Sequence, residues 1–402
     1  MEPGFSPLDE ELELLPGRLS PTLHNVVARL GAAMPFRQVQ AIVQLVGRVP
    51  ISVSTICRVT EQAGAALVAV EDAQVREIER GSLPWPTGAA CLQISVDGAM
   101  VPVQGGVWQE AKTAAIGAFS RTHPGKTTDL SYVSRLQNVD RFSWLAIGEL
   151  HRRGIFTADQ VVAVVDGAPW CQTFLDYHLP HAVRILDFPH AVEHLSQAGQ
   201  TCFGQFSQQA TDWLEVQKHA LRHADPQTVV AAVAALPVAH AADPAQAREV
   251  QRQVHAYLQA RLPQMAYANF TAQGFPIGSG IVESANKLVV EARLKGAGMH
   301  WKAEHVDALL ALRCAICSHT WDAVWPKLSR QRRQTSRRSH PRPSRPAPLS
   351  SPVSAQITTV TQRPPSTPRT PTIVNGKPTK DHPWKQSMVA SRRPLASTIP
   401  KM

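Results

Sequence analysis

Three acidic residues lie where the sequence predicts the ends or beginnings of core elements. Asp97 follows an apolar run that begins at Cys91, Asp166 follows the run VVAVV, and Glu283 lies in the first turn of a predicted helix. Carboxylates from neighbouring strand ends and a facing helix can converge on one pocket, and their oxygens are the ligands that Mg²⁺ and Mn²⁺ prefer. Two such ions about 3.5–4 Å apart support phosphodiester cleavage and transfer. The three carboxylates therefore predict a two-metal site for phosphodiester chemistry.

Each of these acids also has a structural interpretation. Asp97 and Asp166 each precede a glycine, and Asp-Gly pairs are common in turns. Glu283 could be favoured by the positive end of the helix dipole, or it could pair with Lys287 one turn later. We favour the chemical interpretation because the order of the predicted elements brings all three acids to one core.

The segment from residue 91 to residue 190 predicts a mixed sheet with crossover helices. Three strands in a meander come first, the first of them turning at Asp97-Gly98. A helix over roughly 139–154, a strand ending at Asp166, a helix over 169–178 and a strand ending at Asp187 follow. This order predicts an α+β or α/β fold with a ribonuclease H-like core.

Composition and periodicity divide the chain into five predicted segments. In chain order they are a helical DNA-binding domain over 1–85, the first part of the core over 90–190, an all-helical insertion over 191–275, the closing helices with Glu283 over 276–326, and a disordered basic tail over 327–402.

The N-terminal segment resembles a helix-turn-helix. A helix over 36–47 is followed by a break at Arg48-Val49-Pro50 and by a second helix that Ser52 can cap. A further helix is expected from Gly64 to Arg80. The outer face of the second helix would present Ser54, Thr55 and Arg58 to a DNA groove, although any packed helical hairpin can give the same pattern.

The positive charge of the chain is confined to the tail. The formal net charge is +10, but residues 327–402 hold 16 Lys or Arg and one acid, so the rest of the chain has a net charge of −5. A basic tail rich in proline, serine and threonine is expected to be disordered and to contact nucleic acid, or else to be a solvated extension without function. The six scattered cysteines predict reduced thiols, and no apolar run is long enough for a spanning helix. We therefore expect a cytoplasmic, nucleoid-associated protein that does not enter a membrane.

Three strings of the sequence resemble a known family. ISVDGAMVPV, VVDGAPWCQTFLDYHLPHAVRILDFPHAVEHL and GSGIVESANKLVVEARLKGAGMHW are similar to segments of the Asp-Asp-Glu transposases of bacterial insertion sequences of the ISKra type. These are related to the eukaryotic Mutator-like transposases, which also carry a helical insertion before the glutamate. The resemblance implies that Asp97, Asp166 and Glu283 form the metal-binding triad for two Mg²⁺ or Mn²⁺ ions.

The resemblance also implies partners and accessory residues. Asp187 and His190 would act near the metals by orienting a base or a phosphate, although Asp187 could equally be a helix cap. The partners implied are the inverted repeats of the protein's own element and target DNA, bound by a homodimer or higher oligomer. Cations follow the glutamate along the predicted helix and are candidates for DNA contact; they are Lys287, Arg293 and Lys295.

The chain departs from the family at its N-terminus. Relatives usually begin with paired cysteines of a zinc-ribbon type, whereas this chain begins at the segment that follows them, so we expect an N-terminally truncated protein. The alternative hypothesis is therefore a truncated, catalytically inactive DNA-binding remnant of such a transposase.

Two metal-binding patterns compete with the carboxylate site. His190 and His194 fit the HxxEH order of some zinc peptidases, and Cys314 and Cys317 form one CxxC pair. Neither pattern has further ligands in a matching context, so both are better interpreted as packed or exposed helix residues.

Overall fold

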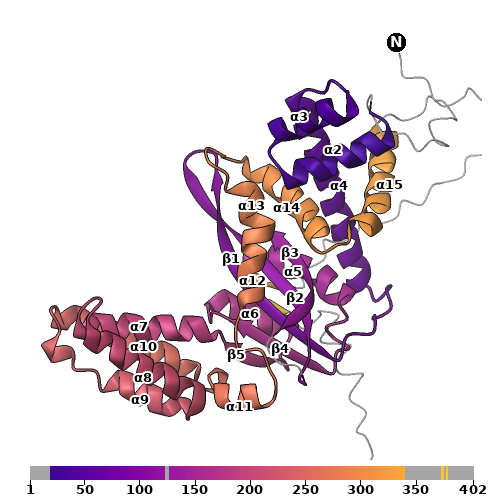
Figure 1. The fold of residues 1–402 in the computed structure, drawn as a ribbon. Coiled ribbons are helices and arrows are strands. Elements are labelled where there is room, and N and C mark those ends of the chain that lie inside the picture. The colour runs from indigo at the N-terminus through magenta and orange to yellow at the C-terminus, as the bar shows by residue number, and fades with distance from the viewer. Residues whose placement is uncertain (1–18, 123–125, 340–372, 375–376, 379–402) are drawn as a thin grey trace, which may run out of the picture.

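The computed structural model describes residues 19–122, 126–339, 373–374 and 377–378 (Figure 1). Its centre is a five-stranded mixed sheet in the order β3-β2-β1-β4-β5. β1 is antiparallel to β2 and parallel to β4, β2 is antiparallel to β3, and β4 is parallel to β5. The mixed α/β class is confirmed, and so is the predicted order along the chain of three strands, a helix, a strand, a helix and a strand. The strands are β1 (Cys91–Val103), β2 (Val107–Phe119), β3 (Thr127–Arg135), β4 (Gln160–Val165) and β5 (Val183–Leu186).

The turn predicted at Asp97-Gly98 is wrong. β1 continues through both residues, with Asp97 opposite Thr113 and Gly98 opposite Lys112 on β2. The chain reverses later, where Gly105 and Gly106 have φ values of +91° and +75°. The ladder extends past Asp97 because apolar alternation continues beyond it, and this outweighs the local preference of an Asp-Gly pair for a turn.

Helices cover both faces of the sheet. α5 (Val139–Arg152) and α6 (Pro169–His178) pack on one face against a core that includes Ile94 and Val96. The other face packs against Val282, Ala285 and Val289 of the closing helix. In Figure 1 this helix lies across the sheet beside β1. It consists of α12 (Gly280–Ala285), the π-helix η3 (Asn286–Glu291) and α13 (Ala292–Leu294), and α14 (Ala303–Cys317) follows it.

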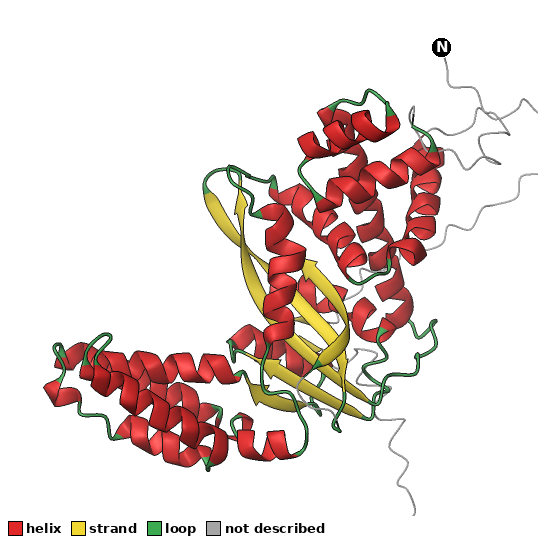
Figure 2. Cartoon of the chain, in the orientation of Figure 1, coloured by secondary structure: helices red, strands yellow, loops and turns green. Residues whose placement is uncertain are grey.

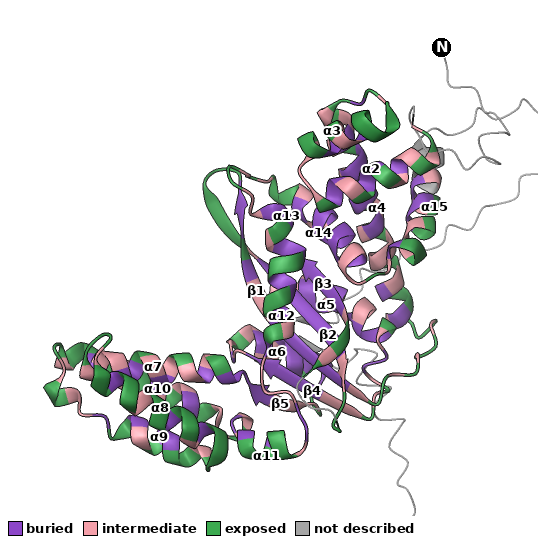
Figure 3. Cartoon of the chain, viewed as in Figure 1, coloured by how far each residue is buried: buried purple, intermediate pink, exposed green. Residues whose placement is uncertain are grey.

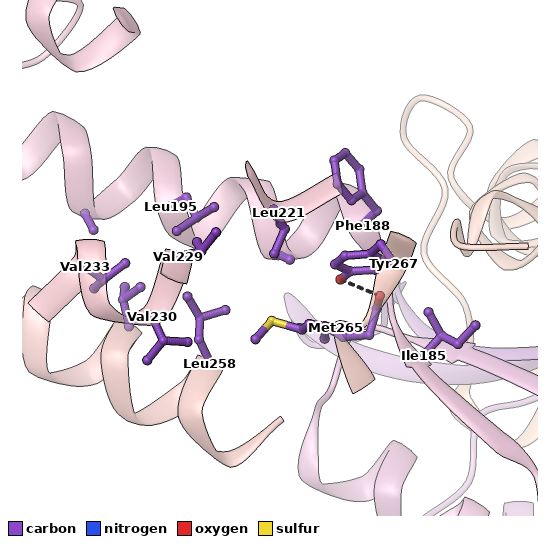
Figure 4. Packing of buried hydrophobic residues seen from close by; sticks show 14 of the residues in the cluster. Ile185, Phe188, Leu195, Leu221, Val229, Val230, Val233, Leu258, Met265 and Tyr267 are labelled. Atoms are coloured by element: carbon purple, nitrogen blue, oxygen red, sulfur yellow. Dashed lines mark hydrogen bonds between the residues drawn. The ribbon is translucent and has the colours of Figure 1, made fainter. Parts of the chain in front are cut away.

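Helices between β5 and α12 form a lobe that projects from the sheet (Figure 2). Figure 4 shows Leu195, Leu221, Val230 and Leu258 packed between these helices, and Tyr267 donating to the carbonyl of Leu186 at the end of β5. The lobe thus has an apolar core of its own that continues into the sheet. Its elements are α7 (Phe188–Phe203), α8 (Gln208–His223), α9 (Pro226–Ala234), η1 (Val238–His240), α10 (Pro244–Ala260), η2 (Leu262–Gln264) and α11 (Tyr267–Ala272).

The N-terminal helices are α2 (Pro21–Ala33), α3 (Phe36–Gly47) and α4 (Val53–Glu79). The sequence predicted two helices in the range of α4, with a new one starting at Gly64, but the structure has one. A Cβ atom on Gly64 would lie 2.1 Å from the carbonyl oxygen of Ala308 on α14. Gly64 therefore permits a close contact between helices rather than a break in the chain.

The predicted tail begins at Lys327, but helix α15 (Trp321–Ser339) continues past that point. Leu328, Ser329 and Arg332 are buried, and Leu328 packs with residues of the N-terminal helices. Figure 3 shows α15 beside α4 with part of its surface buried. Leu328 continues the helical spacing of Trp321, Val324 and Trp325, which precede the predicted tail, and this packing outweighs the basic composition of the stretch. The other described tail residues form a strand pair, β6 (Ile373–Val374) with β7 (Lys377–Pro378), and the rest of the predicted tail lies outside the described residues. None of the described helices has both the length and the apolar character needed to cross a membrane.

Candidate functional site

Three aspartates lie in one row across neighbouring parallel strands. Ile94 of β1 pairs with Ala163 of β4, and Val165 of β4 pairs with Leu186 of β5. Continuing this register past the strand pairs places Asp97 beside Asp166 and Asp166 beside Asp187. Adjacent strands are about 4.8 Å apart, and residues of one row face the same side of a sheet. We call Asp97, Asp166 and Asp187 the aspartate row.

The carboxylate of Asp97 lies in a place that disfavours its charged form. Burial raises its pKa, and the negative charge of Asp166 raises it further. The backbone N–H of Gly98, which donates to Asp97 Oδ1 over 2.7 Å, the side chain of Asn286 and the charge of His190 oppose the rise but do not cancel it. Two carboxylates that repel each other in a partly desolvated place are typical of a cation or catalytic site.

Asn286 links the closing helix to the aspartate row. It is only 6% exposed, and its Nδ2 donates to Asp97 Oδ2 over 2.8 Å. Its Oδ1 accepts no hydrogen bond from the described residues. Asn286 is the first residue of the π-helix η3, and π-helical turns often occur at functional sites. Sequence reasoning missed Asn286, although its position three residues after Glu283 was a signal that both lie on neighbouring parts of one helix face.

Glu283 lies on α12, one turn before Asn286, and is exposed. The structure therefore brings Asp97 and Asp166 together and places Glu283 on the helix that reaches Asp97 through Asn286, but it does not group Glu283 with the two aspartates. Within the described residues, no three His, Cys, Asp or Glu side chains are grouped so that they could hold a metal ion.

Asp187 both caps α7 and orients His190. Its Oδ2 accepts the backbone N–H of His190 over 3.0 Å and lies 2.7 Å from His190 Nδ1, while its Oδ1 accepts the N–H of Ser279 over 2.5 Å. Burial alone would raise the pKa of Asp187, but these hydrogen bonds outweigh it and lower the pKa. The capping interpretation and the orienting interpretation thus describe the same carboxylate.

His190 carries positive charge beside the aspartate row. Its hydrogen bond with Asp187 raises its pKa to about 9 against the opposing effect of burial, and the charges of Glu193 and Asp166 add to the rise. The imidazole is therefore protonated at neutral pH, and about a third of its side chain, 35%, is exposed. A partly exposed cation at this position can face a phosphate.

Helix α10 of the lobe, together with Arg261 directly after it, holds the loop that carries Asp166. The carboxylate of Asp166 accepts the N–H of Ala168 over 2.9 Å, the hydroxyl of Tyr257 donates to the carbonyl of Asp166, and Arg261 Nη2 donates to the carbonyl of Gly167 over 2.5 Å. Gly167 has a φ of +82°, and a Cβ atom there would lie 2.5 Å from Arg261 Nε. Gly167 is thus required by its backbone conformation and by close packing, and the Asp-Gly pair is more than a turn signal. No local pattern could have linked Tyr257 and Arg261 to Asp166, because more than ninety residues separate them.

The predicted DNA-binding cations of the closing segment have different surroundings. Lys287 is exposed, and Lys295 pairs with Glu291 over 2.7 Å. Arg293 is 1% exposed: its Nε donates to the carbonyl of Gly31, and its guanidinium lies 4.8 Å from the ring of Phe36 and 4.9 Å from the ring of Trp301. Burial lowers its pKa to about 10. Arg293 therefore joins the N-terminal helices to the closing helix and, so buried, has no surface to offer a phosphate.

The predicted DNA-reading residues lie at the start of α4. Ser54 and Arg58 are exposed and Thr55 is half-buried, while Ser52 caps the helix by accepting the N–H of Thr55. α3 and α4 pack through a small apolar cluster that includes Val39 and Ile56. The arrangement leaves these polar side chains on one surface, and their contact with DNA stays a prediction.

Neither of the competing metal patterns forms a group of metal ligands in the part of the chain that the structure describes. His190 is bound to Asp187, and the ring of His194 lies 3.9 Å from that of Tyr257. Cys314 and Cys317 are free thiols on α14. Comparison of the sequence with protein-family models and with curated proteins found no match. The geometry of the aspartate row is therefore the basis for any functional proposal.

Proposed function

We propose that the protein is a DNA transposase that cleaves DNA and transfers its strands with two divalent cations, Mg²⁺ or Mn²⁺. The observation that carries this proposal is the aspartate row, in which Asp97 and Asp166 lie side by side and Asn286, one turn after Glu283 on the closing helix, donates to Asp97. The sheet order, with an antiparallel meander followed by two parallel strands, also supports a ribonuclease H-like core. The resemblance to the Asp-Asp-Glu transposases gives the same reaction class.

The residues of the row suit hard cations. The pKa of Asp97 is raised first by burial and then by the negative charge of Asp166, a charge that a divalent cation would offset. The unbonded Oδ1 of Asn286 is a further oxygen at the same place. Asp97 and Asp166 would hold the cations, and Glu283 would be the third carboxylate. Bound cations would activate the attacking water or 3′-hydroxyl and stabilise the leaving oxygen.

Other side chains of the chain would position these groups. Asn286 fixes the orientation of Asp97, and Tyr257 and Arg261 fix the loop of Asp166. His190, held by Asp187, would offer its positive charge to a phosphate of the bound strand. Lys287, exposed one turn beyond Glu283, would contact a neighbouring phosphate.

The test is cleavage of DNA that carries the inverted repeats flanking the protein's own coding sequence, with Mg²⁺ and with EDTA. Glu283→Gln should abolish cleavage while DNA binding and folding persist, because it removes a charged ligand and keeps the shape of the side chain. Glu304→Gln, which changes an exposed glutamate at the start of α14, is the matched control and should cleave normally. Full cleavage by Glu283→Gln would remove the third carboxylate from the proposal.

Lys287→Ala separates positioning from chemistry. We expect it to weaken DNA binding and to lower the salt dependence of binding by about one unit of slope, with a smaller effect on the rate of cleavage of bound DNA. A large loss of cleavage at saturating protein would instead place Lys287 at the reacting phosphate.

The same assay distinguishes the alternative function, an inactive DNA-binding remnant. The exposure of Glu283 on α12 favours this alternative. A protein that binds the inverted repeats but cleaves them with neither Mg²⁺ nor Mn²⁺ would be such a remnant. Sedimentation of the complex would show whether the protein binds as the dimer or higher oligomer that the resemblance implies.

A further inference from the structure

Helix α3 carries an apolar stripe that is buried at one end and exposed at the other. Val39, Val43 and Val46 lie on one face of this helix, because their spacing is four and three residues. Val39 and Val43 are 0% and 4% exposed and pack against α2 and α4, whereas Val46 is 79% exposed. Leu45 beside it is 80% exposed, and Figure 3 shows much of α3 as exposed surface. The last turn of α3 is therefore an apolar surface that the described residues leave uncovered.

The surroundings of this turn are cationic. Residues 19–60 hold four arginines and no Asp or Glu. Arg37 in the first turn of α3 and Arg48 directly after the helix are exposed, and neither forms an ion pair with a described residue. Arg37 also lines an open groove of about 490 Å³ with Gln44 and Pro50. A partner that covers this surface must therefore bring apolar side chains together with negative charge.

Residues 1–18, which lie outside the described residues, have this composition. They hold five acidic residues against one arginine. Leu8, Leu12 and Leu15 have the same four-and-three spacing as the stripe of α3, and Asp or Glu occupies positions 9, 10, 11 and 13 between them. The stretch 8–15 thus combines leucines with carboxylates, and it matches both features of the surface.

This N-terminal segment joins the described fold close to the exposed turn. Leu19, which follows it, packs against the apolar cluster of α3 and α4, and so does Val49, which follows α3. The residues between Leu15 and Leu19 can span about 13 Å when extended. A tethered segment also has an effective concentration of about millimolar at its site, so a weak contact is enough to keep it bound.

We infer that residues 8–15 lie on the exposed last turn of α3, with their leucines on Leu45 and Val46 and their carboxylates facing Arg37 and Arg48. A second copy of the same surface does not fit, because it would bring arginines against arginines. DNA phosphates would suit the arginines but would leave the two apolar side chains in water. The contact is independent of the proposed function, so either can fail alone.

The experiment is photocrosslinking in the full chain, with p-benzoylphenylalanine in place of Leu45 and mass spectrometry of the crosslinked peptides. Crosslinks should join position 45 to residues 8–15 of the same molecule, so that a mixture of isotope-labelled and unlabelled protein gives no mixed pairs. The same probe in place of Val216, another exposed apolar residue, on α8, is the control and should not reach the segment. Crosslinks from position 45 only to described residues, or to a second molecule, would overturn the inference.

Charge reversal gives the second arm. The double variant Glu11→Lys and Glu13→Lys should lower the yield of this crosslink about tenfold, because it replaces two exposed ion pairs by repulsion. Adding Arg37→Glu and Arg48→Glu should restore the yield, since the two reversals together rebuild the attraction.

A variant with the same change in net charge elsewhere is the control for this arm. Glu215→Lys with Glu249→Lys, on exposed faces of the lobe, should leave the yield unchanged. An unchanged yield in the Glu11→Lys and Glu13→Lys variant, or no recovery when the arginines are reversed as well, would show that the segment is not held by these arginines and would overturn the inference.

Discussion

Two polar clusters on the same sheet differ in how their charges are balanced. At the end of β3, Arg135 is 1% exposed and pairs with Glu71 from α4, and its Nη1 also donates to the carbonyl of Ser134 over 2.6 Å. Within β1 and just after β4, Asp97 and Asp166 are like charges with no Lys or Arg bonded to either carboxylate among the described residues.

The pKa directions express this difference. Burial opposes the charge of Arg135, but the opposite charge of Glu71 outweighs it and raises the pKa of Arg135. Burial also raises the pKa of Glu71, but there the charge and hydrogen bond of Arg135 act against the rise. For Asp97, burial and the charge of Asp166 act in the same direction, and both disfavour the charged form. The first cluster is what a folded chain needs for stability, whereas the second keeps negative charge available for something that binds.

The largest effect on stability is expected from breaking the pair between Arg135 and Glu71, which is the balanced cluster. Glu71→Gln should lower the free energy of unfolding by about 3 kcal/mol, because it leaves the buried guanidinium of Arg135 without its counter-charge. Urea unfolding followed by circular dichroism measures this. The control is Glu215→Gln, which breaks the exposed pair with Lys218 and should cost less than about 1 kcal/mol. Equal costs for both variants would show that Arg135 does not depend on Glu71.

The sequence allowed the balanced and unbalanced clusters to be predicted to different extents. Apolar runs ending at Asp166 and Asp187 were sufficient to place both at strand ends, because a strand buried on both faces is a continuous run of apolar residues in the sequence. The neighbourhood of Asp97 was predicted only through the order of strands, and its local turn was wrong because the ladder with β2 decides where β1 ends. Arg135 and Glu71 gave no signal at all, because their pairing depends on helix α4 packing against the sheet.

Dependence on distant parts of the chain also accounts for the errors around the closing helix. Arg293 follows Glu283 in a basic stretch, and from the sequence its charge favoured a DNA contact. Its burial depends on Phe36 and Trp301, which come from distant parts of the chain. Asn286 was missed for the opposite reason, because an amide carries no charge that a search for metal ligands would select. Side chains that act through partners are thus the ones that sequence reasoning could not assign.

The second largest effect concerns His190, whose positive charge partly offsets the negative charge of the aspartate row. His190 has a pKa of about 9 in the folded protein against an ordinary value of 6.5, so its pair with Asp187 stabilises fully below pH 6.5. This stabilisation should disappear as the pH rises through 9. Because a third of the imidazole is exposed, solvent screening reduces the effect to about 1–2 kcal/mol.

Urea unfolding at pH 6, 7.5 and 9.5 measures this loss. His190→Gln should flatten the decline, whereas His223→Gln on the exposed face of α8 should not. A decline of the same size in His190→Gln would show that another group carries it.

The smallest expected effect is the change in stability on replacing Asp97, and its sign tests the difference between the two clusters most directly. The folded state raises the pKa of Asp97, so above both pKa values the ionised carboxylate lowers the stability of the fold, and below them this penalty is absent. Asp97→Asn cannot ionise and still accepts from Asn286 Nδ2, so it should raise the free energy of unfolding at pH 7 by about 0.5–1 kcal/mol while abolishing cleavage.

Asp187→Asn, at the other end of the same row, should do the opposite. Its carboxylate is fully buried and stabilised by three donors, and its pKa is lowered rather than raised. The neutral amide weakens these bonds, so the fold loses stability at pH 7, and the loss should shrink as the pH falls and the native carboxylate becomes protonated. Opposite signs for one substitution at two positions of a single row would identify Asp97 as a group kept for binding and Asp187 as a group kept for structure. If Asp97→Asn destabilises the protein as Asp187→Asn does, the negative charge at Asp97 is already balanced in the fold, and the row has no excess charge with which to hold a cation.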